Sequence, residues 1–277
     1  MEYFEVLGLE RDPFPGSPEP GAFPFSGPQL ECLQQLEIAI RLRRGLSVAL
    51  GGPGLGKTAI CRELLRECDS SGDIDARLLP DPGADDPAAF AARLRQTLRV
   101  PAEGPAGSIH EFQERIKLHL FDQGVTHGRI QCLVIDEGQK LDPERLEILR
   151  ELLNYETNEF KLLQIAIFAR SEFMDRLLSQ PNLADRVNYL HELTPLTFRQ
   201  TREMIATRLA LAASGHTPPP RFSLAAAYRL HRKCQGHPGA LVRLCREALT
   251  AAAGRGKKNV GLADVARGGG AQRPRRR

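Results

Sequence analysis

Hydrophobic positions along this chain follow two patterns, which alternate up to about residue 194. Short apolar runs are typical of buried parallel strands, and they lie at residues 46–50, 76–79, 130–135, 162–168 and 187–193. Between them, apolar residues recur at the spacing of helices, at residues 27–44, 59–68, 87–98, 108–121 and 143–154. Strands that alternate with helices predict an α/β fold with a parallel sheet.

The pattern changes after Pro195, where no further strand is predicted. Helical spacing continues at residues 197–213, 223–233 and 238–252, which predicts a small all-helical module. From Gly254 the periodicity is lost apart from a helical turn at 262–265, so we expect a basic, disordered tail. The chain therefore divides into an arm (1–26), an α/β core (27–194), a helical module (195–253) and a tail (254–277).

The arm combines many prolines with aromatic residues. Proline argues against a helix, and the aromatic residues argue against a disordered linker. We expect an extended arm that its aromatic side chains hold against a surface.

A phosphate-loop motif, G-x-x-x-x-G-K-[ST], lies between the first predicted strand and the helix that follows it. Glycines let backbone N–H groups approach phosphate oxygens, and the helix N-terminus adds partial positive charge. We expect Lys57 to contact the β- and γ-phosphates of a nucleotide and the Thr58 hydroxyl to bind Mg²⁺. The expected nucleotide contacts are Gly51, Gly52, Pro53, Gly54, Leu55, Gly56, Lys57, Thr58 and Ala59.

Two carboxylates, Asp136 and Glu137, follow the apolar strand at 130–135. The carboxyl ends of parallel strands form the ligand-binding edge of an open α/β sheet. We expect Asp136 to bind Mg²⁺ and Glu137 to orient or deprotonate the attacking water. Together with Lys57, Glu137 makes the site hydrolytic as well as nucleotide-binding.

Three further residues are weaker candidates. Arg170 and Ser171 follow the strand at 162–168 and would sense the γ-phosphate there, although a plain surface role fits equally. Arg186 is a candidate catalytic arginine finger that acts on a neighbouring subunit's nucleotide. The other interpretation is a helix-end arginine paired with Asp185 or Glu192.

Composition is ordinary for a globular protein, with 42% hydrophobic and 26% charged residues in a chain of 277. No run approaches the ~18 apolar residues of a membrane span, and the start does not resemble a signal peptide. We expect a cytoplasmic protein.

The six cysteines form no C-x-x-C pair, and Cys234 and His237 lack a second ligand pair for zinc. We interpret the cysteines as small hydrophobic residues in a reducing compartment.

The net charge of +4 is unevenly distributed. Residues 254–277 contain eight basic residues and one acidic residue, a charge of +7 that leaves about −3 for the remainder. The tail is therefore a candidate DNA contact, and a solubilising end is the other interpretation. A generally basic, nucleic-acid-binding body is not indicated.

Several motifs together resemble one family. They are the arm sequence from Phe4 to Phe14 with Ser17–Pro20, the phosphate loop, residues 135–141, residues 154–157 before the next strand, and Leu193–Leu196 with Gly236–Pro238 in the helical module. From Tyr3 to about Ala252 the chain resembles the AAA+ ATPases of the general secretion pathway protein A (ExeA/GspA) type. These are related to transposition ATPases of the TniB/MuB type.

The resemblance implies a P-loop NTPase fold, with a RecA-like αβα sandwich followed by an all-helical AAA+ lid. It also implies a homo-oligomer that hydrolyses ATP with Mg²⁺ and acts on an inner-membrane secretion or polysaccharide assembly protein. Secretion relatives continue into a transmembrane helix and a periplasmic peptidoglycan-binding domain. The sequence shows neither, so we expect no direct membrane insertion, only a peripheral location at the inner membrane through a partner.

The chain departs from the family at two positions. The usual lid arginine is replaced by Gly239, and the usual Gly-Gln after the sensing strand is Ala169-Arg170. Losing one charged hydrogen bond costs about 1.5–3 kcal/mol unless another donor replaces it, and Arg243 lies one turn further on. We hypothesise weak coupling between the lid and the nucleotide.

Three functions stay open from the sequence. The first is an Mg²⁺-dependent AAA+ ATPase coupled to envelope secretion or exopolysaccharide assembly. The second is an ATP-switched DNA-binding regulator of transposition or replication. The third is a nucleotide-dependent scaffold with little hydrolysis, while a small-molecule kinase is disfavoured because no acceptor motif is evident.

Overall fold

A computed structural model of the chain describes residues 2–16, 21, 24–25, 27–83, 86–101, 109–213 and 218–268. The arm motif Ser17–Pro20, the first residue of the helix predicted at 108–121 and the last nine residues of the tail lie outside the described residues. The chain forms two compact units, which we describe separately. Unit 1 comprises Met1–Leu30, Gly54–Gly56 and Thr194–Arg277, and unit 2 comprises Glu31–Pro53 and Lys57–Leu193.

Unit 2 contains a five-stranded parallel sheet in the order β2-β3-β4-β1-β5. The strands are β1 (Leu46–Leu50), β2 (Ile74–Leu79), β3 (Ile130–Ile135), β4 (Leu163–Ala169) and β5 (Val187–Glu192). The predicted α/β fold with a parallel sheet is thereby confirmed. Because β1 lies between β4 and β5, its carboxyl end adjoins the ends of both neighbours.

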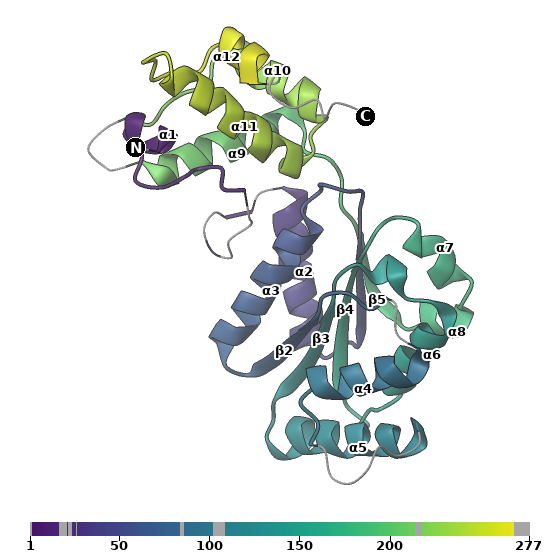
Figure 1. Cartoon of the computed structure of the whole chain (residues 1–277). Coiled ribbons are helices and arrows are strands. Elements are labelled where there is room, and N and C mark those ends of the chain that lie inside the picture. Colours follow the sequence, from purple (N-terminus) through teal and green to yellow (C-terminus); the bar gives the residue numbers. More distant parts are fainter. Residues whose placement is uncertain are drawn as a thin grey trace. The chain divides into compact units, whose positions relative to one another are not determined.

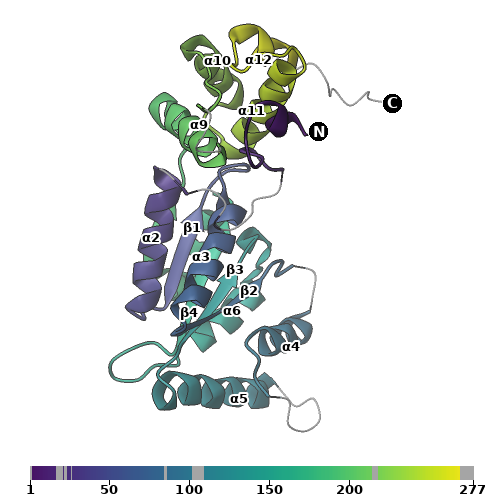
Figure 2. The same cartoon turned by 90° about the vertical axis from the view of Figure 1, so that its left-hand side faces the viewer.

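Helices cover both faces of this sheet (Figures 1 and 2). On one face lie α2 (Pro28–Arg41) and α3 (Lys57–Ser71). The hydrophobic cluster of the other face draws on α4 (Pro87–Thr97), α5 (Ile109–Phe121), α6 (Pro143–Leu152), α7 (Phe173–Leu178) and α8 (Pro181–Ala184). A π-helical turn, η1 (Asp122–Thr126), follows α5, and a 3-10 turn, η2 (Gly138–Lys140), follows β3. The sequence pattern did not predict the short helices α7 and α8.

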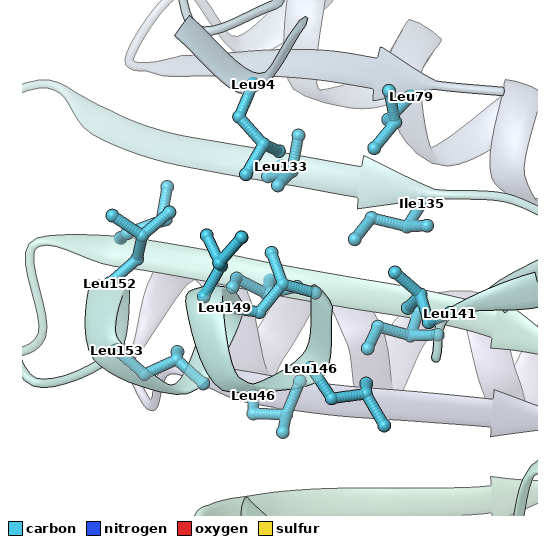
Figure 3. Packing of buried hydrophobic residues seen from close by; sticks show 14 of the residues in the cluster. Leu46, Leu79, Leu94, Leu133, Ile135, Leu141, Leu146, Leu149, Leu152 and Leu153 are labelled. Carbon is cyan, nitrogen blue, oxygen red and sulfur yellow. The ribbon is translucent and has the colours of Figure 1, made fainter. Parts of the chain in front are cut away.

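The core between α6 and the sheet is apolar and closely packed (Figure 3). Leu146, Leu149 and Leu152 project from successive turns of α6 and belong to one buried cluster with Leu46 and Leu133 of the strands. Burial of a leucine side chain contributes about 1.5–3 kcal/mol relative to exposure. This packing holds β1 and β3 in place, and their carboxyl ends carry the phosphate loop and the two carboxylates.

Helix starts follow side-chain caps that the sequence supplies. The Asp86 side chain accepts a hydrogen bond from the Ala89 N–H at the start of α4, and Asp142 does the same for Arg145 in α6. Each cap precedes a proline at the first helical position, where a missing N–H costs nothing. These local signals explain why the predicted helix starts agree with the structure.

Unit 1 is helical, with α1 (Tyr3–Val6), α9 (Phe198–Ala212), α10 (Leu224–Cys234), α11 (Pro238–Ala253) and α12 (Leu262–Gly268). The arm packs into its core, since Leu7, Leu9 and Phe14 are buried in the same cluster as the apolar faces of α9 to α11. The expectation of a wholly extended arm is wrong at α1, which lies beside α11 (Figure 1). The prolines begin only at Pro13, so nothing prevents a helical turn before it.

The predicted start of the disordered tail, at residue 254, is wrong because it lies before the end of the structured region. Residues 254–268 are structured: Val260 forms a bridge with Phe222, and Val265 of α12 is 2% exposed in the core of unit 1. Asp264 is buried and pairs with Arg255. Periodicity missed this segment because it is short and is ordered by residues distant in the sequence.

Among the described residues, no helix is both long enough and apolar enough to cross a membrane. The described part of the chain also has no group of three or more metal-ligating side chains. All six cysteines are buried and unbridged. Burial raises the pKa of the Cys32 thiol to about 12 and that of Cys132 well above its usual value, which agrees with their interpretation as small hydrophobic residues.

Candidate nucleotide-binding site

The phosphate loop joins the carboxyl end of β1 to the first turn of α3. The Gly51 N–H donates to the Ala169 carbonyl at 3.1 Å, which ties the loop to the end of β4. Gly54 and Gly56 have φ values of 77° and 99°, in the left-handed region that glycine adopts without a side-chain clash. Helix α3 begins at Lys57, so its unpaired N–H groups follow directly on the loop.

Lys57 lies against the backbone of its own loop. Its Nζ donates to the carbonyl oxygens of Gly51 at 2.6 Å and Gly52 at 2.9 Å. Burial lowers the pKa of the Lys57 ammonium, while the negative charges of Glu137 and Asp136 oppose that shift. The loop carbonyls thus orient a cation that a bound phosphate would contact.

Thr58 and Asp136 meet although they are distant in the sequence. The Thr58 hydroxyl donates to Asp136 Oδ2 at 2.9 Å. Asp136 is 8% exposed, and its N–H donates to the Leu79 carbonyl at 3.1 Å, so it continues the pairing of β3 with β2. A hydroxyl and a carboxylate are hard oxygen ligands that suit a small divalent cation such as Mg²⁺. The residues present therefore fit the metal that the sequence implies.

Glu137 has an unusual backbone conformation. Its φ and ψ of 55° and 35° lie in the left-handed region, which costs a non-glycine residue about 1–2 kcal/mol. Its N–H donates to Asp136 Oδ1 at 2.9 Å. Gly138 follows so close to β4 that an added Cβ would overlap Ile167 Cγ2. Strained residues that the surroundings hold in place are concentrated at functional sites, so the turn at Glu137 supports a functional role.

Gln139, which the sequence analysis did not single out, connects this turn to the end of β4. Its Nε2 donates to Glu137 Oε2 at 2.5 Å, and its Oε1 accepts from the Arg170 N–H at 3.1 Å. The Arg176 guanidinium in turn donates to the backbone carbonyls of Gln139, at 2.7 Å, and of Leu141. The amide therefore holds the Glu137 carboxylate in one orientation relative to the sheet.

We predict that Gln139→Ala lowers kcat for ATP hydrolysis by about tenfold and changes KM little. The substitution removes a hydrogen bond to a charged group, an interaction of about 1.5–3 kcal/mol, and leaves the phosphate loop intact. Steady-state phosphate release over a range of ATP concentrations separates the two constants. Gln96→Ala, an exposed position on α4, is the matched control, and a rise in kcat for Gln139→Ala would contradict this role.

The weaker candidates have different positions. Arg170 is exposed at the end of β4, and its charge helps to lower the pKa of Lys57, which places it near the loop. Ser171 is exposed beside it. Arg186 precedes β5 at the opposite edge of the sheet, beside Leu46, and lines a small cavity there. Among the described residues it forms no ion pair with Asp185 or Glu192, so the helix-end pairing is not observed.

Gly239 lies at the start of α11 in unit 1. Its N–H donates to the Gly54 carbonyl at 3.0 Å, a contact within that unit. A Cβ added at Gly239 would lie 3.3 Å from this oxygen, so a larger side chain would require a small shift. Arg243 is exposed and pairs with Glu247 at 2.9 Å.

Comparison with known proteins shows what this chain resembles. A family model described as "AAA domain" matches residues 40–177. The chain is 30% identical over 266 residues to General secretion pathway protein A of Aeromonas hydrophila, a match that covers 95% of this chain. Residues 40–177, which the family model matches, form an AAA domain. The chain spans about half of that relative, 47% of its length.

Solved structures show the same fold for this chain. Cdc6p of Pyrobaculum aerophilum has a TM-score of 0.66 at 18% identity, over 93% of this chain and 68% of that chain. The ORC2 protein of Aeropyrum pernix has a TM-score of 0.66 at 12% identity, over 94% and 71%. A RuvB mutant of Thermotoga maritima has a TM-score of 0.60 at 18% identity, over 89% and 72%. The predicted P-loop NTPase fold with a helical C-terminal region is confirmed.

Proposed function

We propose that this AAA+ ATPase binds ATP together with Mg²⁺ and hydrolyses it. The observation that carries the proposal is the 2.9 Å contact between the Thr58 hydroxyl and Asp136. It brings two oxygen ligands from separate elements to the point where α3 begins. A glycine turn without nucleotide chemistry would not need a buried carboxylate opposite its threonine.

Each residue then has a distinct role. The N–H groups of the loop and of the first turn of α3 bind the phosphates, and Lys57 adds a positive charge to them. Thr58 and Asp136 would hold Mg²⁺, which would supply positive charge beside the phosphates. Glu137 accepts a proton from the attacking water, and Gln139 fixes the direction of its carboxylate.

We further propose that the active form is a homo-oligomer. Arg186 lies at the opposite edge of the sheet from the phosphate loop and has no ion-pair partner among the described residues. It therefore does not serve the site of its own chain. An arginine supplied by a neighbouring subunit stabilises the charge of a phosphoryl-transfer transition state, and this is the role we assign to Arg186.

Likeness to General secretion pathway protein A supports a role in the assembly of an envelope system. We propose that ATP turnover drives a conformational change in an inner-membrane secretion or polysaccharide assembly protein. On this proposal the ATPase acts in the cytoplasm, at the inner membrane through that partner.

Phosphate release by the purified full-length chain tests the proposal. We expect steady-state turnover that requires magnesium and stops when EDTA removes it, with ATP binding retained more weakly. The rate should rise more than proportionally with protein concentration if Arg186 acts between subunits. Turnover that is indifferent to EDTA, or no turnover at any protein concentration, would contradict it.

A further inference from the structure

Charge is strongly segregated along this chain. Residues 1–193 carry a net charge of −10, whereas residues 194–277 carry +14. Within the described stretch 194–268 there are thirteen basic residues and three acidic ones, a net +10. The basic character therefore belongs to the helical region itself and not only to the last residues. The net charge of about −3 for residues 1–253 hides this separation, because it adds the basic residues 194–253 to the acidic residues 1–193.

Few of these cations are neutralised inside unit 1. In the described part of residues 194–268, ion pairs join Arg243 to Glu247 and Arg255 to Asp264. Five exposed arginines have no carboxylate partner among the described residues: Arg199, Arg202, Arg221, Arg229 and Arg232. Exposed like charges repel one another in the free protein, so this surface favours a polyanion.

Helices α9 and α10 pack side by side (Figure 2), and each carries an aromatic residue next to one of these arginines, Phe198 before Arg199 and Tyr228 before Arg229. The Phe198 and Tyr228 rings are 5.5 Å apart in an edge-to-face arrangement, and the Arg202 guanidinium lies 5.8 Å from the Phe198 centroid. Tyr228 is 53% exposed although it is a large aromatic residue. We use the name α9–α10 surface for the exposed side chains Arg199, Arg202, Tyr228, Arg229 and Arg232 of these two helices, together with the half-buried Phe198.

A second group of cations extends this patch at the N-terminal end of α10. The Arg221 N–H donates to Asn259 Oδ1 at 3.0 Å, and the Val260 N–H donates to the Arg221 carbonyl at 2.9 Å. This pairing places the exposed Lys257 and Lys258 close to Arg221. The segment that connects α11 to α12 thus adds positive charge to the end of the α9–α10 surface.

We propose that the α9–α10 surface binds nucleic acid, with arginines on the phosphates and Tyr228 available to stack on a base. Guanidinium groups match phosphate oxygens with two parallel hydrogen bonds. Arginines beside an exposed aromatic ring suit a single strand, in which bases are free to stack. This function is separate from ATP hydrolysis and does not depend on it.

An anionic membrane fits this surface less well. A membrane-binding helix needs a broad apolar face that can enter the lipid. The apolar face of α10 is already buried in the core of unit 1, through Ala226, Ala227, Leu230 and Cys234. Its exposed face offers only Leu224 and Tyr228 as large apolar side chains.

The test is binding of a fluorescently labelled single-stranded DNA to the full-length chain, from 50 to 300 mM salt. Binding should weaken linearly on a log–log plot, because displaced counterions dominate the affinity. Replacing two phosphate contacts in Arg229→Ala/Arg232→Ala should reduce the salt slope by about 1.4 and the affinity at 100 mM salt by roughly 10–100-fold. Tyr228→Ala should weaken single-stranded more than duplex DNA.

Three controls keep the test decisive. Lys117→Ala/Arg129→Ala removes the same charge from exposed positions of unit 2 and should leave the slope unchanged. Replacing Arg273, Arg275, Arg276 and Arg277 with alanine tests the residues after 268; loss of binding only in this variant would overturn the proposal. Equal binding to poly-glutamate, or stronger binding to vesicles of anionic lipid, would also overturn it. Unchanged thermal unfolding shows that the variants are folded.

Discussion

Replacing Glu137 with glutamine is expected to lower kcat for ATP hydrolysis by about 10²–10⁴-fold while ATP still binds. A positioned general base contributes an effect of that size, and an amide cannot accept the proton from water. The fold should survive, because glutamine keeps the oxygen to which Gln139 donates and has the same size. The measurements are phosphate release at saturating ATP and equilibrium binding of a fluorescent ATP analogue with magnesium.

The matched control for this variant is Glu144→Gln, an exposed glutamate in the first turn of α6. It removes the same charge from the same unit, away from the loop, and should hydrolyse ATP at the rate of the unchanged protein. Normal turnover in Glu137→Gln would remove Glu137 from the role of base. A loss of ATP binding in Glu137→Gln would instead show that its carboxylate supports the loop.

The second large effect is expected for Lys57→Ala, which should weaken ATP binding by at least 10–150-fold and abolish measurable hydrolysis. A charged hydrogen bond contributes about 1.5–3 kcal/mol, which corresponds to that range of affinity. Because Nζ also donates to the carbonyls of Gly51 and Gly52, the empty loop is expected to lose some order as well. Isothermal titration with ATP and magnesium measures the affinity.

Thermal unfolding without nucleotide separates the two consequences of Lys57→Ala. A large drop in melting temperature would mean that the substitution acts mainly through the loop. A small drop together with lost affinity would mean that the ammonium acts on the phosphates. Lys117→Ala, on the exposed side of α5, is the control for charge alone. ATP affinity that survives Lys57→Ala would contradict the proposed phosphate contact.

The sequence predicted the α/β architecture well because its signals are local. A nearly unbroken apolar run such as residues 130–135 is typical of a strand covered on both faces, and all six residues are buried in the structure. The caps at Asp86 and Asp142 act within three residues, so they too are visible without tertiary information. The phosphate loop is likewise recognisable from a short segment, because its glycines permit a left-handed backbone.

Features missed by the sequence analysis depend on residues far apart in the chain. Helix α12 is ordered by Val260 beside Phe222 and by Val265 in the core of unit 1. The arm contributes Phe14, which is fully buried, to a core built largely by residues about 200 positions later. Gln139 is an ordinary polar residue until folding brings the end of β4 beside it. Each of these features depends on a contact between distant residues, which the spacing of apolar residues along the sequence does not reveal.

By itself, the sequence determined the order of strands and helices, the position of the phosphate loop and the identity of the two carboxylates after β3. Local periodicity and motif spacing suffice for these. Only the tertiary structure decided that Thr58 meets Asp136, that Gln139 orients Glu137, and that Phe198 of α9 meets Tyr228 of α10. Hydrogen bonds and charge fields depend on distance in space, and the packing of the two hydrophobic cores sets that distance.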